Sequence, residues 1–273
     1  AEMMKAENPD AVHIATEGPL GIAARRWCLR RGFPFTTAFH TRFPDYIHAR
    51  FKVPVNWSWA VLKWFHGPSK GVMVATRTLE RELNSRGLGK TKIWTRGVDL
   101  DLFRPRKTDL FDQVDRPVFL FVGRIAIEKN IEAFLKLDLP GTKVVVGDGP
   151  QLPMLRSRFP DVHFVGAKHG DELVSYYNAA DVFVFPSLTD TFGLVMIEAL
   201  ACGVPVAAFP VMGPKDVITS KKIGCLDEDL HAAIRNALQK NREDCRAFAE
   251  ARSWKASAET FQSYLHEFDP SRT

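Results

Sequence analysis

Short apolar runs alternate with stretches in which apolar residues recur every three or four positions, nearly throughout the 273-residue chain. Short runs of this kind are typical of buried strands, and the periodic stretches are typical of amphipathic helices. Strands are expected at residues 12–15, 35–39, 72–75, 92–95, 118–122, 143–146, 162–165, 182–185, 204–208 and 223–226. Helices are expected at residues 21–31, 57–65, 77–85, 130–137, 151–158, 171–180, 193–202, 227–240 and 256–268. This alternation predicts an α/β fold with parallel sheets and crossover helices.

A charged stretch bounded by prolines, residues 104–117, divides the pattern into two parts and is the expected linker. We therefore expect a first Rossmann-like domain at residues 1–106 and a second at residues 107–255. The second has the full alternation of strands and helices, whereas the first is short. The closing helix and tail, residues 256–273, are expected to pack back on the first domain.

Charge is unevenly distributed between the two parts. Residues 1–107 hold 19 Lys and Arg against 9 Asp and Glu, a net charge of +10, whereas residues 108–273 hold 18 against 23, a net charge of −5. The basic part indicates an anionic partner, such as an acidic lipid surface, a phosphorylated acceptor or nucleic acid, unless it is only a solvated surface. No recognition helix or RNA-binding motif supports nucleic acid, so we expect none as a partner.

The cysteines and the hydropathy of the sequence indicate where in the cell the protein is expected. The four cysteines include no Cys-x-x-Cys pair, which is typical of reduced thiols in a cytoplasmic protein. No apolar run of the sequence reaches the ~18 residues that a membrane-spanning helix needs. We expect a cytoplasmic protein that is at most peripheral, on the inner face of the membrane.

Residues 181–206 carry the strongest functional signal. An apolar run at 182–185 leads into a polar loop, and a helix over 193–202 follows. Asp190 lies in the loop and Glu198 in the second turn of the helix. A helix N-terminus that follows a strand can hold a phosphate, because its free backbone N–H groups point outward. Taken singly, Asp190 could be an ordinary helix cap and Glu198 a residue of a solvated helix face.

This segment resembles the donor-site signature of retaining glycosyltransferases of the GT-B fold, family 4, group 1. The signature has two glutamates eight residues apart, with Phe-Gly after the first and Ala-Leu-Ala-x-Gly after the second; Asp190, Phe192, Gly193 and Glu198 match it here. The resemblance implies that the first acid contacts the donor sugar and the second binds the ribose. Thr191, Phe192 and Gly193 are expected to bind the donor as well. Asp190 replaces the usual glutamate and is one methylene shorter, so the sugar pocket is expected to differ.

Cations follow the first strand of the second part. Arg124 and Lys129 lie just before a helix, where fixed cations near the carboxyl end of a strand suit a phosphate. They could also be two surface bases on a loop. By resemblance, both bind the diphosphate and stabilise the departing charge without a metal ion. Gly166 and Lys168, after the third strand, are expected by the same resemblance to lie beside the nucleotide base.

The first part supplies candidates for the acceptor side. His40 ends a strand and, by resemblance, matches a catalytic-site histidine that contacts the donor sugar, although a lone histidine is often structural. Glu17 and Gly18 follow the first strand and begin a helix, and the resemblance places them on the same cleft. Arg42 and Tyr46, just beyond His40, are further candidates for acceptor contacts.

The expected helix at 57–65 is rich in tryptophan and has lysines around it. Trp and Lys suit a membrane interface, but such aromatic spacing is more often a packed core, and the core is the favoured interpretation.

Together these residues predict a fold of two Rossmann-like domains facing across a cleft, the first incomplete because the resemblance begins inside the N-terminal domain. The expected activity is metal-independent transfer of a hexose from a nucleotide diphosphate sugar, GDP-mannose in preference to a UDP-hexose, to a lipid or saccharide acceptor. By resemblance, the leaving phosphate takes the acceptor proton on the front side of the sugar. No cofactor is expected. The alternatives are a non-catalytic nucleotide-sugar-binding protein, an inactive fragment of such an enzyme, and a nucleic-acid binder.

Overall fold

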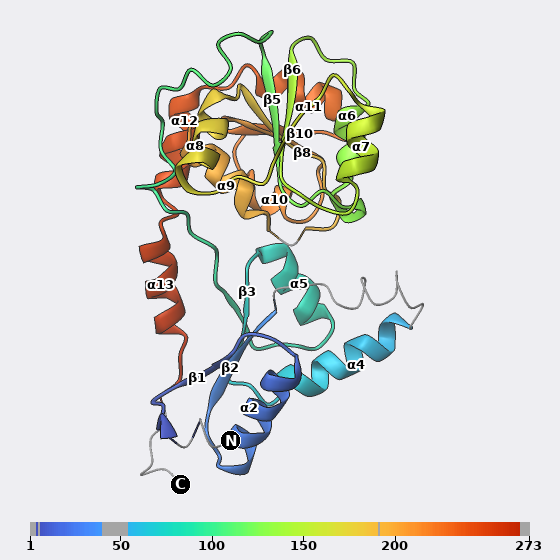
Figure 1. The fold of residues 1–273 in the computed structure, drawn as a ribbon. Coiled ribbons are helices and arrows are strands. Elements are labelled where there is room, and N and C mark those ends of the chain that lie inside the picture. Colours follow the sequence, from blue (N-terminus) through green and yellow to red (C-terminus); the bar gives the residue numbers. More distant parts are fainter. Residues whose placement is uncertain (1–3, 5, 40–53, 191, 268–273) are drawn as a thin grey trace. The chain divides into compact units, whose positions relative to one another are not determined.

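The computed structural model describes residues 4, 6–39, 54–190 and 192–267 (Figure 1). These residues form two compact units, one of residues 1–95 with 257–273 and the other of residues 96–256. Each unit is described separately below. Residues 96–106 belong to the second unit, and the domain limits expected from the sequence stay a prediction.

The second unit is built on a six-stranded sheet in which every pair of neighbouring strands is parallel. The strand order is β10-β9-β8-β5-β6-β7. The strands are β5 (Val118–Val122), β6 (Thr142–Val146), β7 (His163–Gly166), β8 (Val182–Phe185), β9 (Val206–Ala208) and β10 (Gly224–Leu226). The parallel arrangement expected from the short apolar runs is confirmed.

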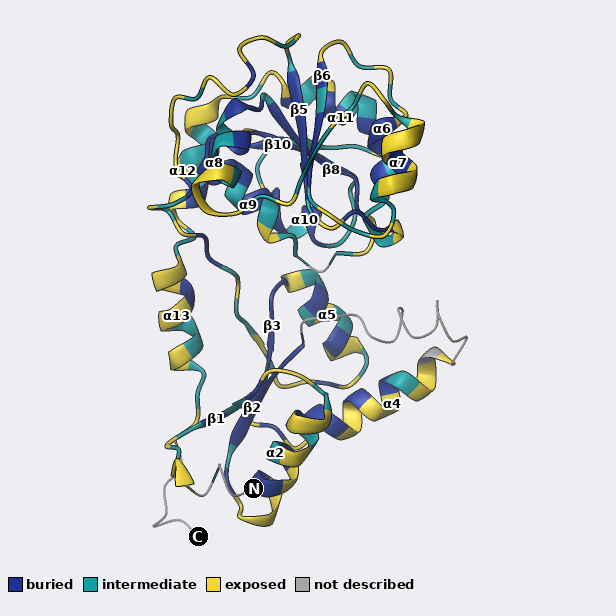
Figure 2. Cartoon of the chain, viewed as in Figure 1, coloured by how far each residue is buried: buried dark blue, intermediate teal, exposed yellow. Residues whose placement is uncertain are grey.

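Side chains of these strands alternate between two hydrophobic cores. Figure 2 shows β5 and β8 as buried. In β5, Val118, Leu120 and Val122 belong to the core under α8 (Gly170–Ala179), α9 (Leu194–Ala201) and α12 (Arg242–Glu250). Phe119 and Phe121 belong to the core under α6 (Ile131–Leu135), α7 (Leu152–Arg158) and α11 (Leu230–Ala237). Because both faces are covered by helices, the strand is apolar at every position.

The helices differ from the sequence prediction in several places. The helix expected at 130–137 is α6, which spans only Ile131–Leu135. A 3₁₀ turn that was not predicted, Ile127–Lys129, precedes it, and Asn130 separates the two with a left-handed φ of 50°. Among the α-helices of the described residues, α10 (Pro214–Val217) and α12 were not predicted. The last helix, α13 (Trp254–Ser263), ends earlier than the expected residue 268, which lies outside the described residues.

The first unit is built on a four-stranded parallel sheet in the order β1-β2-β3-β4. Its strands are β1 (Val12–Ile14), β2 (Phe35–Phe39), β3 (Gly71–Val74) and β4 (Thr91–Ile93), and its helices include α2 (Pro19–Arg30), α4 (Val55–His66) and α5 (Arg77–Ser85). Residues that follow 256 pack on this sheet: Ser257 accepts a hydrogen bond from Trp94 at 3.1 Å, and the ring of Phe261 lies 4.9 Å from that of His13.

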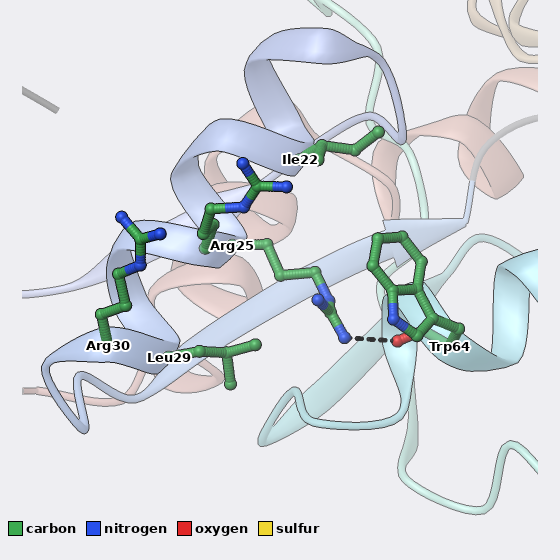
Figure 3. A pocket seen from close by; sticks show the side chains of 6 residues that line it. Ile22, Arg25, Leu29, Arg30 and Trp64 are labelled. Carbon is green, nitrogen blue, oxygen red and sulfur yellow. Dashed lines mark hydrogen bonds between the residues drawn. The ribbon is translucent and has the colours of Figure 1, made fainter.

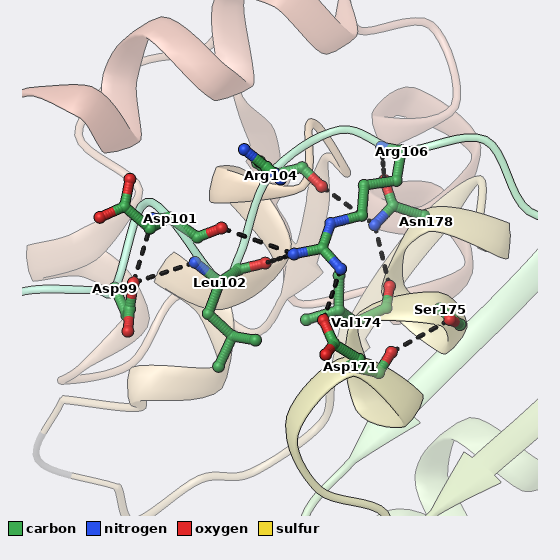
Figure 4. Close-up of polar contacts among 9 residues, drawn as sticks. All are labelled: Asp99, Asp101, Leu102, Arg104, Arg106, Asp171, Val174, Ser175 and Asn178. Atoms are coloured by element: carbon green, nitrogen blue, oxygen red, sulfur yellow. Dashed lines mark hydrogen bonds and ion pairs between the residues drawn. The ribbon is translucent and has the colours of Figure 1, made fainter.

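The beginning of the stretch expected to be a linker is bonded to α8 (Figure 4). The Arg106 guanidinium pairs with Asp171 at 2.5 Å and donates to the carbonyl of Leu102 at 3.0 Å. Asn178, also in α8, accepts from the backbone N–H of Arg106 at 2.8 Å and donates to the carbonyl of Arg104 at 3.1 Å. This segment is therefore part of the second unit and fixes the outer face of α8.

Candidate functional site

The order of strands in the second unit reverses next to β5. The chain runs from β5 outward through β6 and β7, and it then returns to add β8, β9 and β10 on the other side of β5. At such a point the loops after the two central strands turn away from each other, and ligands of open α/β sheets bind between them. The loops after β5 and β8 contain Lys129 and Asp190, so the sheet topology brings these two predicted residues together.

Lys129 and Asp190 form an ion pair at this point. The Lys129 Nζ donates to both carboxylate oxygens of Asp190, at 2.6 and 2.8 Å, across 61 residues of sequence. Both side chains are about three-quarters buried. Asp190 is therefore not a helix cap: α9 begins after Gly193, with no side-chain cap on it among the described residues.

The two loops are also tied together by neutral hydrogen bonds. Asn130 Nδ2 donates to the carbonyl of Pro186 at 3.1 Å. The hydroxyls of Ser187 and Thr189 both donate to the carbonyl of Glu128, at 3.3 and 3.4 Å. The loops thus hold the ion pair in place through contacts on both sides of Lys129, which favours a preorganised site.

Glycines fix the backbone on either side of Asp190. Gly193, with φ of 84°, precedes the first turn of α9, and a Cβ there would lie 2.7 Å from Cε of Met196. Gly213, with φ of 88°, lies in the loop after β9, and a Cβ there would lie 2.5 Å from the carbonyl oxygen of Asp190. Both positions need a left-handed conformation and a close approach that only glycine allows.

Glu198 has a buried partner rather than a solvated one. Tyr177, fully buried in α8, donates its hydroxyl to Glu198 Oε2 at 2.8 Å. Burial raises the pKa of Glu198, and the hydrogen bond from Tyr177 lowers it in part. Burial also raises the pKa of Tyr177 well above its ordinary value, with the nearby Glu198 charge as a further cause. One carboxylate oxygen of Glu198 is thus fixed by the fold.

The other predicted donor-side residues lie elsewhere along the sheet from the Lys129–Asp190 pair. Arg124 follows β5 and makes a long ion pair with Glu128, 3.8 Å from Nη1 to Oε1. Phe192 packs against the core under α9. Gly166 is the last residue of β7, the edge strand, and Lys168 follows it. Lys168 pairs with Glu172 of α8, and this hydrogen bond raises the pKa of Lys168. In the described part of the chain, the ion pair of Lys168 with Glu172 is separate from that of Lys129 with Asp190.

Glu17, predicted for the acceptor side, is held by a buried histidine of the first unit. His66 Nε2 lies 3.1 Å from Glu17 Oε1, and His66 Nδ1 lies 2.9 Å from the hydroxyl of Thr37 in β2. The His66 side chain is fully buried. Gly18 precedes α2, and its carbonyl accepts from the N–H of Ile22 at 2.9 Å. The carboxylate that was predicted for acceptor contacts is therefore positioned by β2 and α4.

Four predicted site residues lie outside the described residues: His40, Arg42, Tyr46 and Thr191. Within the described ranges, no group of three or more His, Cys, Asp or Glu side chains could hold a metal ion. In the same ranges, no helix has the length and apolar character to cross a membrane.

The sequence reasoning missed Tyr177 and His66. Tyr177 is the second residue of a Tyr-Tyr pair before β8, and such a pair in a sequence does not indicate a hydrogen-bond partner. His66 is a polar residue that ends an aromatic helix, and such a residue is a candidate for a buried hydrogen bond. Neither partner could be named without the structure, because Glu198 is 21 residues and Glu17 is 49 residues away in sequence.

Two family descriptions match adjoining parts of the chain. Residues 1–102 match "Glycosyltransferase Family 4", and residues 116–244 match "Glycosyl transferases group 1". The chain belongs to the family 4, group 1 glycosyltransferases. This glycosyltransferase has the expected GT-B class of fold, with two parallel-sheet α/β units.

Curated relatives of this glycosyltransferase use different sugars. The chain is 32% identical to a GDP-mannose-dependent alpha-mannosyltransferase of Mycobacterium tuberculosis, over 80% of this chain and 60% of the relative. It is 30% identical to an enzyme of the same name from Corynebacterium glutamicum, over 93% and 66%. It is also 30% identical to a sulfoquinovosyl transferase of Arabidopsis thaliana, over 79% and 46%. The chain thus spans about half to two-thirds of the length of these relatives.

Solved structures agree with this glycosyltransferase in fold. A sucrose-phosphate synthase from Thermosynechococcus elongatus matches with a TM-score of 0.81 and 25% identity, over 96% of this chain and 75% of that one. HepE of Anabaena, in complex with UDP, matches with a TM-score of 0.77 and 20% identity, over 96% and 81%.

Proposed function

We propose that this chain transfers a hexose from a nucleotide diphosphate sugar to an acceptor hydroxyl, with retention of the anomeric configuration and without a metal ion or cofactor. In this proposal residues 107–255 hold the donor, residues 1–106 hold the acceptor, and residues 256–273 pack on the first domain. The leaving phosphate takes the proton of the acceptor hydroxyl on the front side of the sugar.

The observation that carries the proposal is the Lys129–Asp190 pair between the loops after β5 and β8. A departing diphosphate develops negative charge, which a fixed cation and the N-terminus of α9 would stabilise. Lys129 and Arg124 supply the cations, and the backbone of Thr191, Phe192 and Gly193 leads into α9. Asp190, once Lys129 binds the diphosphate, is free to accept hydrogen bonds from sugar hydroxyls, together with His40.

The ribose and base would lie farther along the sheet. Glu198 would accept hydrogen bonds from ribose hydroxyls through the oxygen that Tyr177 leaves free. Gly166 and Lys168 would lie beside the base. Mannose from GDP-mannose is the proposed donor sugar, because two of the relatives named above are GDP-mannose-dependent enzymes. The sulfoquinovosyl transferase relative is the reason to test other donors beside it.

The acceptor is proposed to be a lipid or a saccharide that contacts Glu17, Gly18, Arg42 and Tyr46. The proposed location is the cytoplasm, with attachment to the inner face of a membrane. The basic character of the first part, a net charge of +10 over residues 1–107, supports an anionic acceptor or surface.

The first test is calorimetric binding of GDP, UDP, ADP, GDP-mannose and UDP-glucose to the purified chain. A preference for GDP that GDP-mannose strengthens is the expected result, and binding of none of the five would overturn the proposal. The anomeric configuration of the product, read by NMR, then tests the reaction: an inverted anomer excludes the front-side path. Donor turnover that is lost in Arg124→Ala separates an enzyme from a non-catalytic nucleotide-sugar-binding protein.

A further inference from the structure

The aromatic helix α4 of the first unit is only half explained by core packing. Trp59 and Phe65 are buried, as the core interpretation requires. Trp57, Val61 and Trp64 are 73%, 59% and 52% exposed, and their spacing of four and three residues places them on one side of the helix. Three bulky apolar side chains in a row facing water indicate a surface with a binding role.

A shallow hollow of about 200 Å³ lies between α4 and α2. It is lined by Ile22, Arg25, Arg26, Leu29, Arg30 and Trp64 (Figure 3). Arg25 is buried and bridges the two helices, donating from Nε to the carbonyl of Phe65 at 3.0 Å and from Nη2 to the carbonyl of Trp64 at 2.6 Å. Its guanidinium also lies 4.1 Å from the centre of the Trp64 ring. Arg25 therefore fixes Trp64 at the rim of the hollow, and the surface is preformed.

The remaining arginines of the hollow are free to bind an anion. Arg26 and Arg30 are exposed and one helical turn apart, and no hydrogen bond or ion pair joins either to another residue of the described part of the chain. Neither α2 nor α4 contains an aspartate or glutamate. The positive charge of this face is therefore not compensated on its own helices.

Apolar exposure is concentrated on the same two helices. In the described part of the chain, twelve large hydrophobic residues are exposed, and five of them lie on α2 or α4. Those five are Leu20, Leu29, Trp57, Val61 and Trp64. Tryptophan beside uncompensated arginine, with no acid among them, matches the boundary of a bilayer whose head groups are anionic.

We propose that the exposed face of α2 and α4 binds the surface of an anionic phospholipid bilayer. Trp57, Val61 and Trp64 enter the layer between head groups and acyl chains, and Arg26 and Arg30 pair with phosphodiester groups. The pattern favours this occupant, because tryptophan suits the boundary between head groups and acyl chains and uncompensated basic residues are attracted to anionic lipids. This face would provide the membrane attachment that the proposed function includes, and the inference rests on that part of it. Attachment requires no donor, so vesicle binding can fail while donor binding and transfer stand.

The test is co-sedimentation of the full chain with vesicles of phosphatidylcholine alone and with vesicles of equal parts phosphatidylcholine and phosphatidylglycerol. We expect binding to the anionic vesicles that weakens with added salt, and little binding to the neutral ones. A basic residue near such a surface contributes about fivefold in binding, so Arg26→Glu with Arg30→Glu should weaken the partition coefficient by at least about tenfold. Trp57→Ser with Val61→Ser should weaken it by a similar factor, since both remove apolar area from the interface.

Matched controls are Lys221→Glu with Lys222→Glu, and Trp254→Ser, which change exposed residues of the same types elsewhere. They should bind vesicles as the unchanged chain does, and circular dichroism checks that every variant is folded. Equal binding to neutral and anionic vesicles, or equal losses in the controls, would overturn the proposal. Sedimentation velocity without vesicles tests whether the face binds a second copy of the chain instead. If the chain self-associates, Trp57→Ser with Val61→Ser abolishes this, and no vesicle binding is found, the face belongs to a dimer and the proposal is overturned.

Discussion

Two acids of the second unit have partners of opposite kinds. Asp190 binds the ammonium group of Lys129 through both of its oxygens, in a loop. Glu198 accepts one hydrogen bond from the neutral hydroxyl of Tyr177, inside a helix. The first pair is neutral as a unit, whereas the second carries the whole charge of the carboxylate in a place where burial raises its pKa.

From this difference we expect the two acids to act in different ways toward a ligand. In the proposed function a diphosphate would compete with Asp190 for Lys129, so the ion pair would be exchanged when the ligand binds. Tyr177 is fully buried and keeps its hydrogen bond, so Glu198 is held in one orientation throughout. The predictions below test whether the first pair serves the reacting charge and the second only the position of the ribose.

The largest effect is expected from Lys129→Ala. Loss of one group that stabilises developing charge in a transition state lowers turnover by about a hundredfold to a thousandfold. Initial rates with the donor identified by calorimetry measure the change. Lys136→Ala is the matched control, because Lys136 pairs with Glu132 on an outer helix face of the same unit and should change the rate by less than about twofold. A normal rate in Lys129→Ala would remove this residue from the chemistry.

Gly213→Ala is expected to break the first pair through the backbone. The new Cβ would meet the carbonyl oxygen of Asp190 at 2.5 Å with φ of 88°, so the loops must shift at a cost of about 2–3 kcal/mol in the free energy of unfolding. Gly166→Ala is the control, because its φ of 77° is also left-handed but its Cβ would meet nothing within 4 Å; about 1 kcal/mol is expected there. Urea unfolding measures both, and equal losses would show that the contact with Asp190 is unimportant.

Tyr177→Phe tests the second pair with a smaller effect. The variant removes one hydrogen bond of about 1 kcal/mol, so nucleotide diphosphate binding should weaken about fivefold. The same nucleotide lacking both ribose hydroxyls should bind the variant and the unchanged chain equally. Calorimetry with the two nucleotides distinguishes a positioning role, which affects only the ribonucleotide, from a structural defect, which weakens both.

The smallest effect is expected from the titration of Glu198. Because burial raises its pKa, the folded chain binds this proton more tightly than the unfolded chain does. The resulting stability is fully present below the ordinary glutamate value of 4.5 and is lost as the pH rises through the raised value. Glu198→Gln cannot ionise, so it does not lose this stability. As the pH rises, the free energy of unfolding of the variant should therefore increase relative to that of the unchanged chain. Urea unfolding at pH values from about 4 to about 8 measures the difference, and a constant difference would contradict it.

Elements bounded by clear breaks were predicted to the residue. β5, β8 and α5 have the expected limits, because each is an apolar or periodic run that ends at a turn or a change of charge. α12 was missed because its apolar face is short: Cys245 and Ala249 are buried and Phe248 packs partly against the same core.

The acids and cations of the donor side were predicted as a set, but their pairing was not. Asp190 was expected to contact a sugar or to cap a helix, and its bond to Lys129 depends on β8 returning to the far side of β5. Strand order depends on tertiary packing, and the local pattern of apolar and polar residues does not predict it. The partners Tyr177 and His66 were missed for the same reason, since each lies on a helix that packs beside the acid it binds.

The alternation of β5 between two cores limits how the chain can change in length. One residue inserted before Phe119 would turn Phe119 and Phe121 toward the helices that now cover Val118 and Leu120. A second inserted residue would return each side chain of β5 to its present core. It would also move the loop that contains Lys129 about two strand positions past Asp190. Lineages of this fold should therefore keep the length of β5 fixed and accept insertions only where a loop separates the strand from the charged pair.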